Sequence, residues 1–491
     1  MPQINDLFDG LPTSPVSSRA RVRAIVRDAR EATSGDLFVC MAGERADGHD
    51  FALEAYARGA RLFLASRFLP LPTDALQILC ADTAPLYPIL CARFFRNAHR
   101  GLRLIAITGT KGKTSTLAFL SAILHATGSP CGRIGTLGIG IGDTLTPTCN
   151  TTPDAYLLHQ ALASFKQSGI RTAILEVSSQ AIAKGRVDGL SYERAIFTNL
   201  SVDHIGAGEH ASFADYRDCK GAVLARAKQT ILNCDDPHFS FFASQNRGHT
   251  TYGFRADADC HGIADSLSLE DAGFSAACRI QLAQEEATLE LATPGLYQCY
   301  NAMSAITCAY TMGIPLSLSV EAVRQVRIPG RFEVYPLSNG STVIIDYAHN
   351  EAALRAVFSQ IYRYKHNRLL VVIGSVGERS KLRRASMGEL CAAFADLTIF
   401  TADTPCRESV REIAEEMQAG FHRKEHPKTG ISYIIEDRAE AILFALSKAE
   451  AGDFILLAGK GHETEMQAGE ARIPFDERQL IRSALAAPSA T

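Results

Sequence analysis

The sequence lacks the features that mark three classes of protein. Its 13 cysteines are scattered singly, and none forms the C-x-x-C pair that is typical of zinc and redox sites. No apolar run approaches the roughly 18 residues that a membrane-spanning helix requires. The first residues, MPQINDLFDGL, carry acids and no long apolar core, so we expect no signal peptide. These absences predict a cytoplasmic protein whose cysteines are buried, reduced thiols.

An excess of charge of either sign is also missing. The chain has 50 Lys and Arg against 53 Asp and Glu, a net charge of −3, and no basic run that could form an electrostatic stripe. The chain therefore lacks the usual charge signature of a nucleic-acid-binding protein, and its balanced charge favours small-molecule substrates. A hydrophobic content of 46% and a charged content of 21% are ordinary for a globular protein.

Length and alternating patterns predict an α/β protein with three domains, because 491 residues are too many for one core. Residues 1–97 alternate short β-like runs with a helical stretch at Asp50–Arg58 and form a small α/β domain. Residues 98–330 form a central domain with a mostly parallel sheet. In residues 331–491 strands and helices alternate, which predicts a doubly wound, Rossmann-like sheet.

The clearest chemistry lies in residues 105–116, IAITGTKGKTST. An apolar strand, Leu102–Thr108, leads into Gly109 and Gly112, which allow tight turns so that backbone N–H groups can face phosphate oxygens at a helix N-terminus. Lys113 can reach the outer phosphates, and the two hydroxyl residues after it can serve a magnesium ion. The predicted phosphate-binding residues are Gly109, Thr110, Lys111, Gly112, Lys113, Thr114 and Ser115.

Two further strands end in candidate metal ligands. The run Thr172–Val177 carries Glu176 near its end, and a carboxylate there is costly to bury without a partner. At the carboxyl edge of an α/β sheet, where ligands bind, a metal ion is the natural partner. The run Arg194–Thr198 leads to His204, which reaches the same edge if the strands are neighbours.

The short G-T-K-G-K-T loop resembles that of the Mur ligase family, ATP-dependent enzymes that form amide bonds of the peptidoglycan stem peptide, and of their folylpolyglutamate synthetase relatives. Other segments resemble the tripeptide-synthetase type of this family: D-A-R at 28–30, D-Y-A-H at 346–349 and G-K-G-H-E at 459–463. The resemblance spans all three domains. It implies that the first domain holds uridine diphosphate, the central domain is a P-loop ATPase, and the third domain holds an amino acid.

The resemblance also implies roles for single residues. Glu176 and His204 resemble the magnesium ligands, to which Thr114 and, if carbamylated by carbon dioxide, Lys220 are added; Lys113, Glu176, His204 and Lys220 are the implied catalytic set. ATP contacts are implied for Asn301, Arg331, Asp346 and His349. Substrate contacts are implied for Asn150, Thr151, Thr152, Ser178, Lys184, Arg186, Arg384, Asp403, Thr404, Arg407, Gly459 and Glu463. From the residues alone, 150–154 could equally be a simple helix cap.

The implied activity is the ATP- and Mg²⁺-dependent addition of a third amino acid to UDP-N-acetylmuramoyl-L-alanyl-D-glutamate through an acyl phosphate, by a monomer. Members that use meso-diaminopimelate typically carry D-N-P-R, whereas this chain has D-T-P-C at 403–406 with Arg407 one place late. We favour meso-diaminopimelate slightly over L-lysine because Arg407 could swing in. The alternatives are an accessory ligase for a different acid, a folylpolyglutamate-type ligase and a P-loop ATPase whose ligase activity has decayed.

Overall fold

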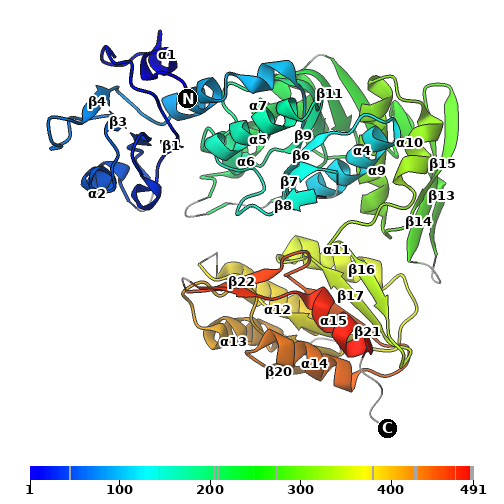
Figure 1. Cartoon of the computed structure of the whole chain (residues 1–491). Helices are drawn as coiled ribbons and strands as arrows, with labels where there is room; N and C mark the ends of the chain where they lie inside the picture. Colours follow the sequence, from blue (N-terminus) through cyan, green and yellow to red (C-terminus); the bar gives the residue numbers. More distant parts are fainter. Residues whose placement is uncertain are drawn as a thin grey trace. The chain divides into compact units, whose positions relative to one another are not determined.

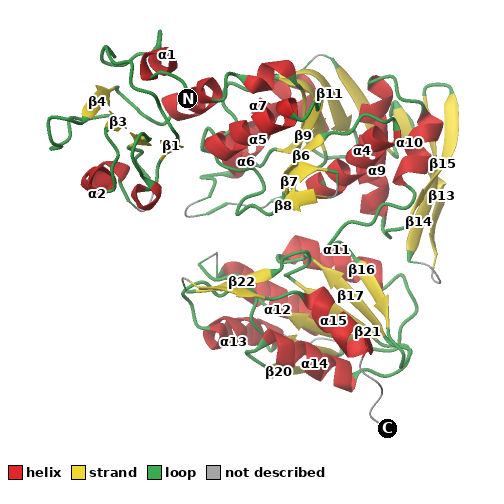
Figure 2. Cartoon of the chain, viewed as in Figure 1, coloured by secondary structure: helices red, strands yellow, loops and turns green. Residues whose placement is uncertain are grey.

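The computed structural model describes residues 1–43, 46–142, 144–202, 205–206, 209–246, 248–270, 274–378, 381–423, 430–469 and 471–486 (Figure 1). Two compact units divide the chain: residues 1–262 with 280–287 and 300–322, and residues 263–279 with 288–299 and 323–491. The helices and mostly parallel sheets confirm the predicted α/β class (Figure 2). The domain boundaries after residues 97 and 330 stay a prediction.

The N-terminal sheet is parallel, with strand order β1-β2-β3-β4. One apolar core lies between this sheet and α1 and α3, and a second contains side chains of α2. The predicted helix at 50–58 is shorter, because Asp47 caps a 3₁₀ turn before it. The elements are β1 (Ile25–Val26), β2 (Leu37–Val39), β3 (Leu62–Ala65), β4 (Leu76–Leu79), α1 (Ile4–Phe8), α2 (Ala52–Ala57), α3 (Leu86–Phe94), η1 (Ala29–Glu31), η2 (Gly48–Phe51) and η3 (Ala98–Gly101).

The second sheet has the order β15-β14-β13-β12-β11-β10-β5-β9-β6-β7-β8. Its strands are β5 (Arg103–Thr108), β6 (Gly132–Gly135), β7 (Gly138–Ile141), β8 (Thr144–Thr146), β9 (Thr172–Glu176), β10 (Tyr192–Phe197), β11 (Ala227–Asn233), β12 (His249–Gly253), β13 (Cys260–Glu270), β14 (Ser275–Leu282) and β15 (Glu285–Leu291). Its helices are α4 (Lys113–Ala126), α5 (Ala155–Gln167), α6 (Ser179–Ala183), α7 (Phe213–Ala225), α8 (Phe239–Ser244), α9 (Leu296–Thr311) and α10 (Leu316–Val323).

The position of β5 decides what meets at the edge of this sheet. β5 pairs in parallel with β9 on one side and with β10 on the other. The register places Ile107 beside Glu176 and Thr108 beside Phe197, so the three strands end together. The glycine-rich loop, Glu176 and the segment after β10 therefore share one carboxyl edge, because β9 and β10 both neighbour β5, which was the condition of the prediction.

The third sheet has the order β16-β17-β21-β18-β19-β20, and all its neighbours are parallel except β16 and β17. Helices α11, α12 and α13 contribute to the apolar core on one face, and α14 and α15 to the core on the other, which confirms a doubly wound sheet. The strands are β16 (Glu333–Pro336), β17 (Thr342–Asp346), β18 (Leu369–Ile373), β19 (Leu397–Phe400), β20 (Ile431–Ile434) and β21 (Phe454–Ala458); β22 (Glu465–Ala468) and β23 (Ala471–Pro474) form a separate ribbon. The helices are α11 (Glu351–Ile361), α12 (Leu382–Phe394), α13 (Val410–Phe421), α14 (Arg438–Lys448) and α15 (Glu477–Ala486).

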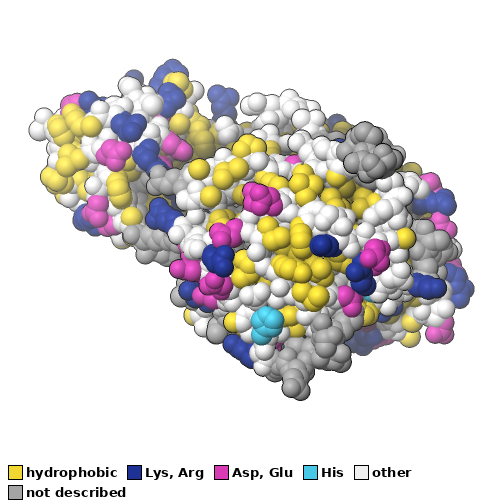
Figure 3. Space-filling view, turned by 90° about the horizontal axis from the view of Figure 1, so that it is seen from below, with side chains coloured by type: hydrophobic (Ala, Val, Ile, Leu, Met, Phe, Trp, Pro, Cys, Tyr) yellow, Lys and Arg dark blue, Asp and Glu magenta, His cyan; other side chains and the backbone are white. Residues whose placement is uncertain are grey.

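Three observations relate to the predictions made from the composition: the state of the cysteines, the apolar length of the helices, and the distribution of surface charge. None of the 13 cysteines forms a disulfide with another described residue, and most are buried, although Cys149 is exposed. None of the helices in the described part of the chain is long and apolar enough to cross a bilayer. On the face drawn in Figure 3, acidic and basic side chains lie interspersed among hydrophobic ones.

Candidate functional site

The glycine-rich loop connects the end of β5 to the first turn of α4, and two glycines give it its shape. Gly109 and Gly112 have φ values of +148° and +87°, in the region that side chains disfavour. A Cβ at Gly109 would collide with the hydroxyl of Thr198, and a Cβ at Gly112 would collide with the carboxamide of Asn301. Both positions therefore need glycine, and Asn301 lies directly against the loop.

The segment after β10 holds the loop from the other side. The Asn199 side chain accepts a hydrogen bond from the Lys111 N–H at 3.0 Å, and the Thr198 hydroxyl donates to the Lys111 carbonyl at 2.6 Å. The Thr110 N–H donates to the Asn199 carbonyl at 2.8 Å. These two support residues were not predicted, because nothing in the sequence pairs residues 198–199 with residue 111.

Lys113 folds back over the loop that precedes it. Its Nζ donates to the carbonyl of Gly109 at 2.8 Å and to that of Thr110 at 3.1 Å. Because α4 begins at this lysine, the N–H groups of its first turn lie at the end of the same loop. A cation and a helix N-terminus together form a site suited to phosphate.

Glu176 is 1% exposed and takes three hydrogen bonds from neutral donors. The Thr114 hydroxyl donates to Oε2 at 3.0 Å, the Thr136 N–H donates to Oε1 at 3.0 Å, and the Thr136 hydroxyl donates to Oε2 at 3.0 Å. A cavity of about 10 Å³, close to the space that one water needs, is lined by Thr114 and Glu176 among others. Hard oxygen donors beside a phosphate site fit Mg²⁺. Thr136 was missed by sequence reasoning.

Lys220 is buried on α7, and its Nζ donates to the Gly109 carbonyl at 2.9 Å and lies 4.3 Å from the centre of the Tyr216 ring. The Tyr216 hydroxyl is in turn 3.0 Å from the hydroxyl of Thr110. Lys220 therefore lies beside the P-loop, whereas its carbamylation and its role at a metal stay predictions. His204, the other predicted magnesium ligand, lies outside the described residues.

The hydroxyl-rich turn before α5 is tied to the strand that carries Glu176. The Thr152 hydroxyl donates to the Glu176 carbonyl at 2.8 Å and accepts from the Ser178 N–H at 3.0 Å, and Arg186 donates to the Thr152 carbonyl at 2.9 Å. The Thr151 hydroxyl lies 3.0 Å from that of Thr136. The structure brings these predicted substrate residues together, while Asn150 and Lys184 are exposed. Asp154 caps α5, which confirms the helix cap, whereas the substrate contacts of this turn stay a prediction.

A second group of predicted residues lies at the carboxyl ends of β17, β19 and β21, within the second unit. The Asp346 carboxylate accepts from the Phe332 N–H at 2.9 Å, next to Arg331, whose guanidinium is 4.9 Å from the Tyr347 ring centre. The His349 ring nitrogen Nδ1 lies 2.8 Å from the Tyr347 carbonyl. Gly459, directly after β21, donates to the Asp346 carbonyl at 3.1 Å.

Lys460 organises the polar cluster beside these strand ends. It is fully buried, and its Nζ donates to Glu463 Oε2 at 2.6 Å and to the Thr404 hydroxyl at 3.3 Å. Tyr347 donates to the other oxygen of Glu463 at 3.1 Å. Asp403 is 2% exposed, and its Oδ2 has no hydrogen-bond partner among the described atoms. Sequence reasoning named Asp403 and Glu463 but missed Lys460 as the buried cation that pairs with Glu463.

The two arginines expected at the amino acid are placed differently. Arg384 is fully buried and ion-paired with Glu408 at 2.9 Å and Glu416 at 2.8 Å. Arg407 is exposed, one position after Cys406, whose φ is +54°. Their roles stay predictions.

Burial raises the pKa of the Glu463 carboxyl above its usual value, Lys460 lowers it, and Asp403 raises it again. A carboxyl whose pKa is raised by folding stabilises the fold most below its unfolded pKa, and this contribution is lost as the pH rises through the folded pKa. We therefore expect Glu463→Gln to gain stability relative to the parent as the pH rises from about 4.5 to neutral. Urea unfolding of both proteins across this range measures the difference. A difference in unfolding free energy that stays constant with pH would contradict the raised pKa of Glu463.

Three family models match the chain. The model described as Mur ligase family, catalytic domain, matches residues 21–77; the Mur ligase middle domain matches residues 107–309; and the Mur ligase, glutamate ligase domain, matches residues 330–461. Together they cover parts of all three sheets described above.

Relatives and solved structures match over most of the chain. A UDP-N-acetylmuramoyl-L-alanyl-D-glutamate–2,6-diaminopimelate ligase of Geobacillus kaustophilus is 35% identical over 473 residues, 94% of each chain, and that of Listeria monocytogenes serovar 1/2a is 32% identical over 496 residues, 98% of each chain. A solved structure of such a ligase has a TM-score of 0.66 at 27% identity and covers 100% of this chain and 99% of its own. A MurF ligase of Thermotoga maritima in complex with ADP has the same fold, with a TM-score of 0.62 at 20% identity over 89% of this chain and 94% of its own. With matches along nearly its whole length, the chain belongs to the Mur ligase family.

Proposed function

We propose that this chain is an ATP-dependent ligase that adds an amino acid to UDP-N-acetylmuramoyl-L-alanyl-D-glutamate, with meso-diaminopimelate favoured over L-lysine. The observation that carries the proposal is the P-loop lysine beside the Thr114–Glu176 pair, in a chain that matches ligases of that name over 94–98% of its length. ATP is the phosphoryl donor of this proposal, in line with the ADP bound to a structural relative.

The chemistry proceeds in two steps. A substrate carboxylate attacks the γ-phosphate of ATP, an acyl phosphate forms and ADP leaves; Lys113 and the first-turn N–H groups of α4 stabilise the charge that accumulates on the phosphoryl oxygens. The amine of the amino acid then attacks the activated carbonyl, loses a proton, and releases inorganic phosphate as the amide forms.

The residues around Glu176 fit a magnesium ion, which would neutralise phosphate charge when bound. The Thr114 hydroxyl and the Glu176 carboxylate would hold it, with His204 and Lys220 as further ligands. As an ammonium, Lys220 donates to a carbonyl and has no lone pair to offer, so this role requires its carbamylation.

Replacing Glu176 by glutamine keeps the shape of the side chain and removes its charge. We expect the Mg²⁺ concentration at half-maximal activity to rise about 10- to 100-fold, because an amide is a weaker ligand than a carboxylate. Activity titrated with Mg²⁺ at saturating ATP measures the change. The matched control is Glu193→Gln, since Glu193 pairs with Lys228 at the surface. An unchanged Mg²⁺ requirement would remove Glu176 from the proposed metal site.

The proposed division of labour follows the predicted domains. Residues 1–97 hold the uridine diphosphate end of the acid, residues 98–330 bind ATP, and residues 331–491 hold the amino acid near Asp403 and Glu463. We further propose a cytoplasmic monomer that binds no nucleic acid and acts at no membrane.

The decisive experiment measures phosphate release from ATP and Mg²⁺ with UDP-N-acetylmuramoyl-L-alanyl-D-glutamate against a panel of meso-diaminopimelate, L-lysine, L-ornithine and other amino acids. Release that requires both the muramoyl dipeptide and one amine establishes the ligase and names its amino acid. A silent panel with intact ATP binding would overturn the proposal. The silent panel would instead favour a second candidate function, an accessory ligase that acts on a different acid. The D-T-P-C sequence at 403–406 supports this candidate.

Arg407 tests the choice of amino acid. If its guanidinium binds the distal carboxylate of meso-diaminopimelate, Arg407→Ala should raise the KM for this amino acid at least about tenfold, since a charge-assisted bond contributes about 1.5–3 kcal/mol. The KM for ATP should not change. Equal KM values for variant and parent would count against meso-diaminopimelate.

A further inference from the structure

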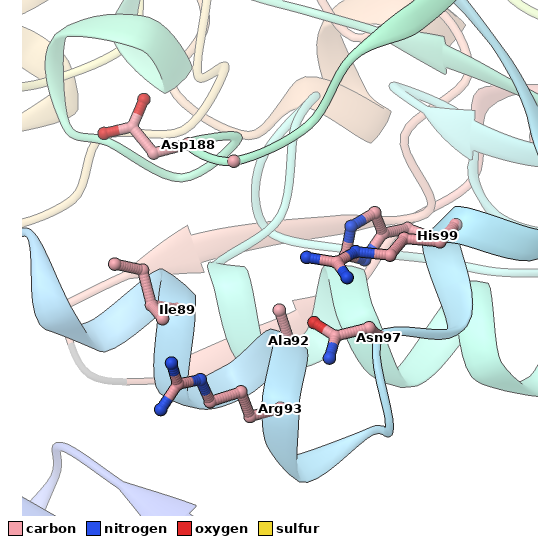
Figure 4. A pocket seen from close by; sticks show the side chains of 8 residues that line it. Ile89, Ala92, Arg93, Asn97, His99 and Asp188 are labelled. Carbon is pink, nitrogen blue, oxygen red and sulfur yellow. The ribbon is translucent and has the colours of Figure 1, made fainter. Parts of the chain in front are cut away.

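A pocket of about 330 Å³ lies in the first unit, and none of the residues assigned above lines it (Figure 4). Its walls come from α3, from η3 and from the turn that contains Asp188 and Gly189. This volume reaches the lower end of the range, about 300–1,000 Å³, that small-molecule sites occupy. The pocket is therefore large enough for more than a bare ion.

Two guanidinium groups give this pocket its charge. Arg93 is fixed, because its Nη1 donates to the carbonyls of Leu7 at 2.8 Å and Asp9 at 2.7 Å. Its other nitrogens and the whole guanidinium of Arg100 have no acceptor among the residues that the structure describes. Two cations with unused donors at one cavity favour an anion that can accept several hydrogen bonds.

The acid at this pocket does not neutralise them. Asp188 is ion-paired with Arg226 at 3.1 Å, and in Figure 4 its carboxylate points away from Arg93 and His99. Burial, with a contribution from Arg100, lowers the pKa of His99, so its ring is neutral at pH 7. The positive charge of the pocket therefore comes from Arg93 and Arg100.

Neutral polar groups complete the lining. His99 has a buried Nδ1 without a partner among the described atoms. The Asn97 carboxamide lies between Arg93 and His99 in Figure 4, and no partner is described for it either. The backbone is left-handed at both Arg96 and Asn97, with φ values of 55° and 51°. The turn that these two residues form brings η3 back beside α3.

We propose that this pocket binds a small phosphate-bearing molecule, at a site separate from the P-loop. A phosphate monoester offers a dianion for Arg93 and Arg100 and acceptors for Asn97 and His99. Its carbon skeleton would lie against Ile89 and Ala92. The pocket adjoins η3, which leads directly into β5, so a ligand here would contact the segment that precedes the P-loop strand.

The test measures binding of glycerol 3-phosphate by isothermal titration calorimetry to the full chain, in a phosphate-free buffer and with ADP and Mg²⁺ saturating the P-loop. Arg100→Ala removes a cation without breaking a described contact, and Ala92→Leu fills the space into which the Ala92 methyl points in Figure 4. The matched control is Arg171→Ala, because Arg171 is exposed and has no described side-chain partner. Melting curves without ligand establish that each variant is folded.

We expect one site in the unmodified protein, a loss of affinity of about tenfold or more in each pocket variant, and no change in the control. The proposal is overturned if the ADP-saturated protein binds no glycerol 3-phosphate, or if Arg100→Ala binds as tightly as the control. It is also overturned if Arg100→Ala weakens binding while Ala92→Leu does not, because the arginine would then attract anions at the open surface. ADP affinity should be equal in all four proteins, which keeps this result independent of the ligase activity.

Discussion

Lys113→Ala should lower the ATP-dependent reaction rate by about 10³-fold, the loss seen when one stabilising donor is removed from a developing negative charge. The structure holds the ammonium over the loop through the carbonyls of Gly109 and Thr110, at 2.8 and 3.1 Å. Because these carbonyls are weak partners for a cation, a bound phosphate would compete for it effectively. The measurement is kcat for amine-dependent phosphate release at saturating ATP.

A control separates this effect from a general loss of positive charge. Lys228→Ala removes a lysine that pairs with Glu193 at the surface and is 78% exposed, so we expect its kcat to match that of the parent. The Lys113→Ala protein should unfold at nearly the same urea concentration as the parent, since the two carbonyls that accept from Lys113 are neutral. A loss of kcat below about tenfold would exclude Lys113 from stabilising the transferred phosphoryl group.

Arg438→Met should destabilise the second unit by about 3–5 kcal/mol, the cost of leaving a buried charge without its partner. Arg438 and Glu477 are both fully buried, 2.7 Å apart. Burial raises the pKa of Glu477, and Arg438 is the strongest of the nearby charges that lower it. Arg438 also donates to the carbonyls of Ala402 at 2.9 Å and Ala458 at 2.8 Å, the residues immediately before Asp403 and Gly459. It is therefore a positioning residue for the proposed amino-acid site.

Two measurements distinguish these effects. Urea unfolding gives the loss of stability, and the KM for the amino acid at low temperature, where the variant stays folded, should rise while the KM for ATP does not. The matched control is Arg411→Met, because the ion pairs that Arg411 makes with described residues, Glu415 and Glu436, are exposed, and its removal should cost less than about 1 kcal/mol. Equal stability of Arg438→Met and its control would show that this pair contributes little.

Local pattern was enough to predict the P-loop and the strands that lead to the site. The predicted strand Leu102–Thr108 is β5 with one residue less, Thr172–Val177 is β9 without its last residue, and the lysine opens α4 as expected. Such features are local, since spacing along ten to fifteen residues sets both the glycine turn and the start of the helix. The same holds for the doubly wound class of the C-terminal part, which strand and helix alternation predicts.

Contacts between segments that are distant in the chain could not be predicted from the sequence. Nothing in the sequence indicated that Thr198 and Asn199 support the P-loop, that Thr136 satisfies Glu176, or that Lys460 contacts Thr404. These partners lie on segments whose adjacency depends on the order of strands in the sheet, and many orders are compatible with one hydrophobic pattern. Arg384 shows the same limit, because a motif can mark an arginine while only packing determines that it pairs with Glu408 and Glu416.

The sequence by itself therefore determined the class of fold, the phosphate loop and the family. The tertiary structure decided which polar groups meet, which charges are buried with a partner, and where an unassigned cationic pocket forms between α3, η3 and the turn at residues 188–189. The physical reason is that backbone conformation and apolar periodicity are set by near neighbours in the chain, whereas hydrogen bonds and ion pairs of buried side chains are satisfied by whichever distant segment the packing brings within reach.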